Sequence, residues 1–118
     1  MAFPSRVLGS GTSGGQTQAI CGDVSASVTA TGTTAVDAAS VSAVVTRVST
    51  AAAGTGVKLP PAEVGAMMVV RNDGANALAV YPSTGGTING AASDSIAAAK
   101  ANLYFGTSDT AWVSIDGA

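Results

Sequence analysis

The chain has 118 residues, a length typical of one domain, and carries a net charge of −2 with no histidine and one cysteine. Hydrophobic residues make up 47%, but 24 of them are alanine, and Leu, Ile, Val and Phe together also number 24. Without histidine, Ser–His or Cys–His catalysis and zinc sites of the usual nitrogen–sulfur type are excluded. The five basic residues are scattered, so we expect no nucleic-acid partner.

The apolar residues are thinly spread, although the mean hydropathy is +0.40. The longest strongly apolar run, Met67–Val70, is far too short to span a membrane, so we expect no membrane partner. A thin core combined with a positive mean hydropathy predicts that the chain buries surface against other copies of itself. We therefore expect a homo-oligomer, and a homotrimer in particular.

Residues 1–19 combine glycine with serine, threonine and glutamine, a composition that favours extended coil. We predict an extended N-terminal arm over 1–19 and a single β domain over 20–118. The arm carries three large apolar side chains, and Arg6 adds a planar donor that can pair with a carboxylate. We expect the arm to dock on a neighbouring subunit; the alternative is that it covers an edge of its own sheet. The apolar side chains are Phe3, Val7 and Leu8.

The first half of the domain predicts two strands. Residues 24–36 alternate valine and alanine with serine and threonine, which indicates a strand buried on one face and broken near Gly32. Residues 41–50 are β-branched on both faces and predict a strand buried on both sides. Residues 57–59 precede Pro60-Pro61 and are therefore expected to be extended.

The middle of the chain predicts a β-hairpin. Residues 67–72 and 78–81 are apolar runs typical of strands, and Asn72–Asn76 between them contains the turn signal Asp-Gly. Further turns are expected at Pro82–Gly86 and at Asn89-Gly90.

The last third predicts two strands joined by a turn. Residues 92–101 fit either a short helix or a short strand at 95–98, and the surrounding strands favour the strand. Residues 103–105 and 111–115 are expected to be strands joined by a turn at 106–109, with Trp112 facing away from Val113 and Ile115. The predicted fold class is all-β, a small antiparallel β-sandwich or open barrel.

The polar residues offer little chemistry. The seven acidic residues lie mostly beside glycine, serine or asparagine in predicted turns, so we expect no catalytic carboxylate pair, no metal site and no cofactor. Tyr81, Tyr104 and Trp112 are interpreted as core residues or interface anchors, with a sugar-binding platform as the alternative. Met67 is also a candidate for subunit contacts.

Four segments in the second half of the chain form a distinctive set: 53–60, 69–82, 85–90 and 111–113. They read Ala-Gly-Thr-Gly-Val-Lys-Leu-Pro, Val-Val-Arg-Asn-Asp-Gly-Ala-Asn-Ala-Leu-Ala-Val-Tyr-Pro, Gly-Gly-Thr-Ile-Asn-Gly and Ala-Trp-Val. Together they resemble a β-module of small virion proteins of tailed bacteriophages, which include head decoration (cement) proteins and parts of tail fibres. The resemblance covers roughly residues 50–115 and implies a structural protein without catalytic residues.

The function that follows from this resemblance is that of a capsid decoration protein on the outer surface of the virion. Such a protein stabilises the head by binding the major capsid protein, here as a homotrimer where capsomers meet. The alternative is a tail-fibre or tail-tip subunit that binds a host surface glycan. The predicted interface residues are Phe3, Arg6, Val7, Leu8, Met67, Tyr104 and Trp112.

Overall fold

The computed structural model describes residues 11, 13, 16 and 22–117, and the described chain is built from β-strands. The prediction of an all-β fold is confirmed. The strands are β1 (Val24–Thr29), β2 (Ala39–Ser40), β3 (Val45–Thr50), β4 (Gly56–Lys58), β5 (Met67–Asn72), β6 (Leu78–Tyr81), β7 (Thr87–Ile88), β8 (Asp94–Ile96), β9 (Ala101–Gly106) and β10 (Ala111–Asp116).

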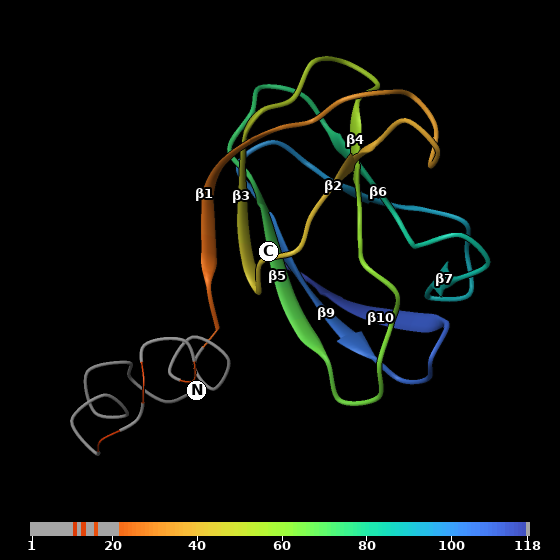
Figure 1. Ribbon diagram of the computed structural model, residues 1–118. Coiled ribbons are helices and arrows are strands. Elements are labelled where there is room, and N and C mark those ends of the chain that lie inside the picture. The colour runs from red at the N-terminus through yellow and green to blue at the C-terminus, as the bar shows by residue number, and fades with distance from the viewer. Residues whose placement is uncertain (1–10, 12, 14–15, 17–21, 118) are drawn as a thin grey trace.

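The strands form two sheets, and the chain crosses from one to the other after nearly every strand (Figure 1). The six-stranded sheet has the order β1-β3-β5-β9-β10-β7, and the four-stranded sheet has the order β2-β4-β6-β8. Strands β1, β3 and β5 pair in parallel, and so do β2, β4 and β6. The expectation of an antiparallel sandwich or barrel is therefore wrong for the first six strands, which coil like a solenoid.

The predicted hairpin at Asn72–Asn76 is also wrong. Strand β5 pairs with β3 and β9, whereas β6 lies in the other sheet and pairs with β4 and β8. The turn instead carries the chain from one sheet to the other. The fully buried side-chain amide of Asn72 holds this crossing in place, because it donates to the Asn76 carbonyl at 2.7 Å and to the Ile96 carbonyl at 3.0 Å. Its amide oxygen also accepts a hydrogen bond from the Gly74 N–H at 3.0 Å.

This crossing stacks on the preceding one, which runs through Ala51. The side-chain amide of Asn76 donates to the Ala51 carbonyl at 3.0 Å. A Cβ on Gly74 would lie 2.7 Å from the Ala51 nitrogen, so the close approach requires glycine at this position. The Asp-Gly pair thus marks a turn, as predicted, but the turn joins two sheets.

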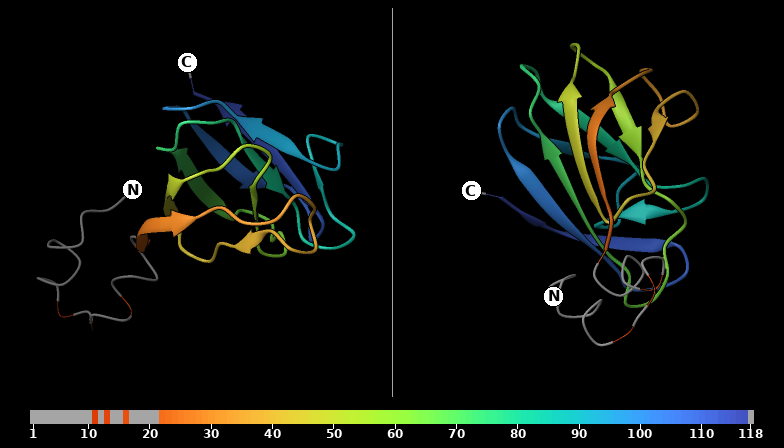
Figure 2. Two further views of the ribbon diagram at one scale, coloured as in Figure 1. Left: turned by 90° about the horizontal axis from the view of Figure 1, so that it is seen from above. Right: turned by 60° about the vertical axis from the view of Figure 1, so that its left-hand side comes forward.

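The end of the chain behaves as predicted. Strands β9 and β10 form an antiparallel hairpin, and residues 94–96 form strand β8, which agrees with the favoured expectation of a strand in this region. Antiparallel pairing of β9 with β5 places this hairpin against the last parallel coil. Figure 2 shows the two sheets facing each other, with β9 and β10 continuing the larger one.

The hydrophobic core lies between the sheets, and a polar link crosses it. The Tyr104 hydroxyl of β9 donates to Asp94 Oδ2 of β8 at 2.8 Å, and the Asn102 amide donates to the same oxygen at 3.1 Å. Burial, followed by the hydrogen bond to Asp94, raises the pKa of Tyr104 far above its ordinary value, so the hydroxyl keeps its proton. The largest core side chains are Trp112, Tyr104, Leu59, Leu78, Ile88 and Ile96.

Two other expectations need correction. The strand predicted over 24–36 ends at Thr29, and Val24 at its start is 64% exposed. The strand predicted over 41–50 is not buried on both sides, because Arg47 is exposed whereas its neighbours Thr46 and Val48 are fully buried. The β-branched residues of β3 therefore indicated a strand but not its burial.

Candidate interaction surface

The outward face of the six-stranded sheet carries a row of aliphatic side chains that crosses five strands. Strand register aligns one such residue from each of β1, β3, β5, β9 and β10, and each of them is partly or largely exposed. We call this row the central rung; it consists of Val24, Val45, Val69, Leu103 and Ile115.

A second row lies two residues away along the strands. Met67 of β5 aligns with Phe105 of β9, which aligns with Val113 of β10. Met67 is 42% exposed and Val113 is 38% exposed. We call this row the lower rung, and the two rungs together form the outer apolar face.

The alternation of each strand explains why this face exists. In β5 the residues Met68, Val70 and Asn72 point into the core, so Met67 and Val69 point outward. Strand β10 follows the same rule, because Trp112 is buried and Ile115 is 59% exposed. These strands are thus apolar on both faces, and only one face is covered by the described chain.

An ion-pair cluster borders the central rung on the side away from the lower rung. Arg47 and Arg71 are aligned on neighbouring strands, and the Nε atoms of both donate to Asp73, at 2.8 and 2.6 Å. The bond from Arg47, followed by that from Arg71, lowers the pKa of Asp73 below its ordinary range. The carboxylate relieves the repulsion between the aligned arginines and leaves this margin weakly positive.

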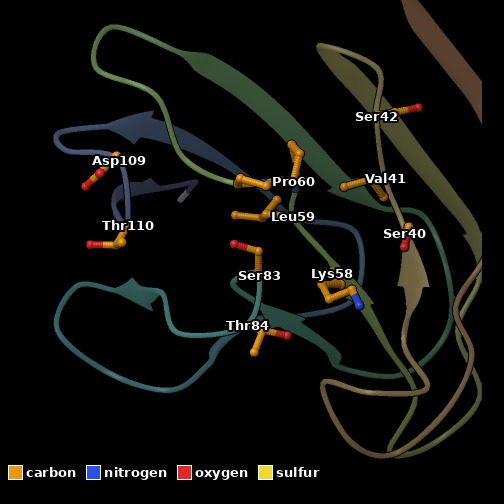
Figure 3. A pocket seen from close by; sticks show the side chains of 11 residues that line it. Ser40, Val41, Ser42, Lys58, Leu59, Pro60, Ser83, Thr84, Asp109 and Thr110 are labelled. Carbon is orange, nitrogen blue, oxygen red and sulfur yellow. The ribbon is translucent and has the colours of Figure 1, made fainter.

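A groove lies elsewhere, where the crossings after β2, β4 and β6 meet the turn between β9 and β10 (Figure 3). Its volume is about 620 Å³. The crossings are joined by hydrogen bonds from the Val41 N–H to the Lys58 carbonyl at 3.0 Å and from the Leu59 N–H to the Tyr81 carbonyl at 2.8 Å. The groove is lined by Ser40, Val41, Ser42, Lys58, Leu59, Pro60, Pro61, Ser83, Thr84, Asp109 and Thr110.

The polar side chains of the groove are mostly hydroxyls. Lys58 and Asp109 are its two charged residues, and the remaining polar groups are hydroxyls. Across the described residues, no group of three or more histidines, cysteines and carboxylates is placed to hold a metal ion. The groove therefore offers hydrogen bonding over an apolar floor of valine, leucine and proline.

Other carboxylates act in local structure. Asp37 accepts hydrogen bonds from the Thr34 hydroxyl at 2.8 Å and from the Thr34 N–H at 2.9 Å, and these bonds lower its pKa. Asp23 accepts a hydrogen bond from the Val44 N–H at 2.9 Å. These are the turn and strand-end roles expected of isolated carboxylates.

The residues that the sequence suggested for interfaces have different positions. Phe3, Arg6, Val7 and Leu8 lie outside the described residues, whereas Met67 lies on the outer apolar face. The arm is described only at residues 11, 13 and 16, where Ser13 and Gln16 exchange side chain–backbone hydrogen bonds.

Tyr104 and Trp112 require a correction. They are 0% and 2% exposed and fill the core between the sheets, so neither presents a surface to a partner or a platform to a sugar. Tyr81 is partly buried, and its hydroxyl donates to the Thr33 carbonyl at 3.1 Å. The sequence favoured the large aromatics and, apart from Met67, did not identify the outer apolar face. The signal for this face was the pair Val113 and Ile115 opposite Trp112, one from each rung.

In the described part of the chain, no helix is long and apolar enough to cross a membrane. Comparison with protein-family models, with curated proteins and with solved structures finds no match for this chain.

Proposed function

We propose that this chain is a structural protein of a tailed-bacteriophage virion, a capsid decoration protein that binds the outer surface of the head and stabilises it as a homotrimer. The observation that carries this proposal is the outer apolar face, which gives the folded chain an apolar surface to bury between the subunits of such a homotrimer. No chemistry is required of such a protein, because its work is to add contact area between subunits.

The sequence resemblance over residues 50–115 supports the same role. The segments that carry it contain β4, β6, β7 and parts of β5 and β10. They supply Val69 and Val113 to the outer apolar face and Lys58, Leu59 and Pro60 to the groove. Subunits of one oligomer strengthen one another's binding to the shell, because the attachment of one subunit holds the others close to their own binding sites on the shell. The major capsid protein is the proposed partner on the shell.

A reconstruction of the isolated particle tests this role. The proposal predicts density for this chain at many symmetry-related positions on the outside of the head. Density at a few copies on the tail or at one vertex would contradict it. Particles stripped of the protein are expected to lose their contents at lower temperature than decorated particles.

A second candidate is a tail-fibre or tail-tip subunit that binds a host surface glycan, and the groove favours it. Five lining residues are serine or threonine, and Pro60 and Pro61 lie beside them as an apolar floor. Hydroxyls both donate and accept hydrogen bonds, which suits an uncharged carbohydrate. Titration of the labelled protein with host cell-wall oligosaccharides separates the two roles, because glycan binding predicts chemical-shift changes confined to the groove.

A further inference from the structure

We propose that other copies of this chain cover the outer apolar face, so that the central rung and the lower rung form the subunit interface of the homo-oligomer. This inference deepens the self-association expected in the proposed function. It concerns the free protein, and it can therefore fail or succeed independently of binding to a capsid.

The face can form the apolar centre of a specific contact. The eight residues of the two rungs, at about 4.8 Å per strand and about 6.8 Å per rung, cover about 260 Å² in flat projection, and protruding side chains increase the accessible area. An interface of standard size buries about 800 Å² on each partner, and apolar patches above a few hundred Å² mark interaction sites. The face thus supplies the apolar centre of one such footprint, and neighbouring residues complete it.

The chemistry of the face favours a second copy over a different partner. The two rungs contain no charged side chain and no side-chain hydrogen-bonding group, so they offer little by which to select a particular foreign protein. Apolar surfaces of this kind complement one another, and homo-oligomer interfaces are the more apolar class. Every copy carries the same face, so a second copy in solution supplies an apolar surface that matches it.

The margin of the face is compatible with close approach. Asp73 bonds both Arg47 and Arg71, so the carboxylate reduces the net charge that the cluster of each copy brings to the contact. In a trimer, three such sheets would turn their outer faces toward the symmetry axis, and each central rung would contact both neighbours. No hydrogen bond of the fold needs to break, because the backbone of β3, β5 and β9 is already paired on both sides.

Mass measurement on the full-length protein tests the proposal. Sedimentation or light scattering at micromolar concentration is expected to give a multiple of 11.3 kDa for the wild type. Val24→Glu and Ile115→Glu each place a charge on the central rung at a residue that is more than half exposed, so the fold of one chain should tolerate them. Each is expected to weaken association by at least ~100-fold.

Val36→Glu is the matched control, since Val36 is 90% exposed in the loop between β1 and β2 and belongs to neither rung. It should leave association unchanged. Circular dichroism on all variants separates lost association from lost folding. If a central-rung variant unfolds, Val113→Glu in the lower rung provides a second test of association.

Three results would overturn the proposal. A wild-type monomer at 100 µM, roughly the upper end of such a titration, would mean that the capsid or the chain's own residues 1–21 cover the face. Equal weakening by Val36→Glu and Ile115→Glu would show a nonspecific charge effect. Unchanged association of Ile115→Glu would place the interface elsewhere. An oligomer that depends on the central rung but does not bind heads would instead contradict the proposed function alone.

Discussion

The two sheets of this protein are alike on the inside and different on the outside. Both turn valine, leucine or isoleucine into the shared core. On the outside, the six-stranded sheet presents the outer apolar face, whereas the four-stranded sheet presents small and polar residues in register. One row consists of Ser40, Lys58 and Tyr81, and the other of Gly56, Ala79 and Ser95, where Gly56 is buried beside the Tyr81 ring.

The contrast shows what the high alanine and valine content does in this fold. A coil of short strands needs only one apolar face per strand, so outward residues are free to vary. Along β2, β4, β6 and β8 they are small or polar, as solvent contact requires. In the central rung and the lower rung of β5, β9 and β10 they are large and apolar, which is the condition expected of a sheet that another protein layer covers.

The core between the faces is expected to be far more sensitive than either face. Trp112→Ala removes one of the largest buried side chains and leaves a cavity, at a cost of about 3–5 kcal/mol in the free energy of unfolding. Urea denaturation measures this cost, with Val36→Ala as an exposed control. A loss below about 1 kcal/mol would mean that Trp112 is not packed between the sheets.

The crossing at Asn72 is expected to have the next largest effect, because it carries the chain between the two sheets. Asn72→Ala removes two hydrogen bonds to carbonyls and one from the Gly74 N–H; the bond to Ile96 is buried and the other two are partly buried. We expect a loss of about 2–3 kcal/mol. Asn76→Ala, which removes one bond from a more exposed residue, is the comparison and should cost less. Equal costs would contradict the special role of the buried amide.

The polar link between the sheets is expected to contribute less. Tyr104→Phe removes the hydroxyl that donates to Asp94 and keeps the ring in the core. A loss of about 1–2 kcal/mol is expected, since the lost bond is to a carboxylate. The same substitution is then made in an Asp94→Ala background. If the difference in the free energy of unfolding between Tyr104 and Phe disappears there, the effect comes from the hydrogen bond to Asp94. A persistent difference would assign it to packing.

The smallest effect concerns the margin of the outer apolar face. The pKa of Asp73 is lower in the folded chain than in the unfolded chain, where it is about 3.9. Its contribution to stability is therefore present above that value and is lost as the pH falls through the lower folded pKa. Thermal unfolding between pH 2 and 7 should show a weaker acid dependence for Asp73→Asn than for the wild type. Identical profiles would show that the cluster does not contribute.

Much of the strand content could be predicted from the sequence, but the pairing of the strands could not. Short apolar runs bounded by turn signals located β5, β6, β9 and β10. An Asp-Gly turn indicates that the chain reverses direction, yet it does not determine whether the next strand joins the same sheet. Here the buried amide of Asn72 decides that, and its partner Ile96 lies 24 residues away.

The candidate surface was predictable only in part for the same reason. The sequence placed Trp112 opposite Val113 and Ile115 but did not indicate which side of β10 was covered. The outer apolar face also depends on the register of five strands from distant parts of the chain. Residue size favoured the aromatics as interface anchors, whereas burial between the sheets assigned them to the core.

The solvent exposure of three side chains in the intact, full-length protein tests the central claim most directly. A soluble paramagnetic agent broadens the methyl signals of exposed residues and spares those that another molecule covers. The account predicts strong broadening for Val36, and protection for Val24 and Ile115, although all three are exposed in a single chain. Equal broadening of all three would show that nothing covers the outer apolar face.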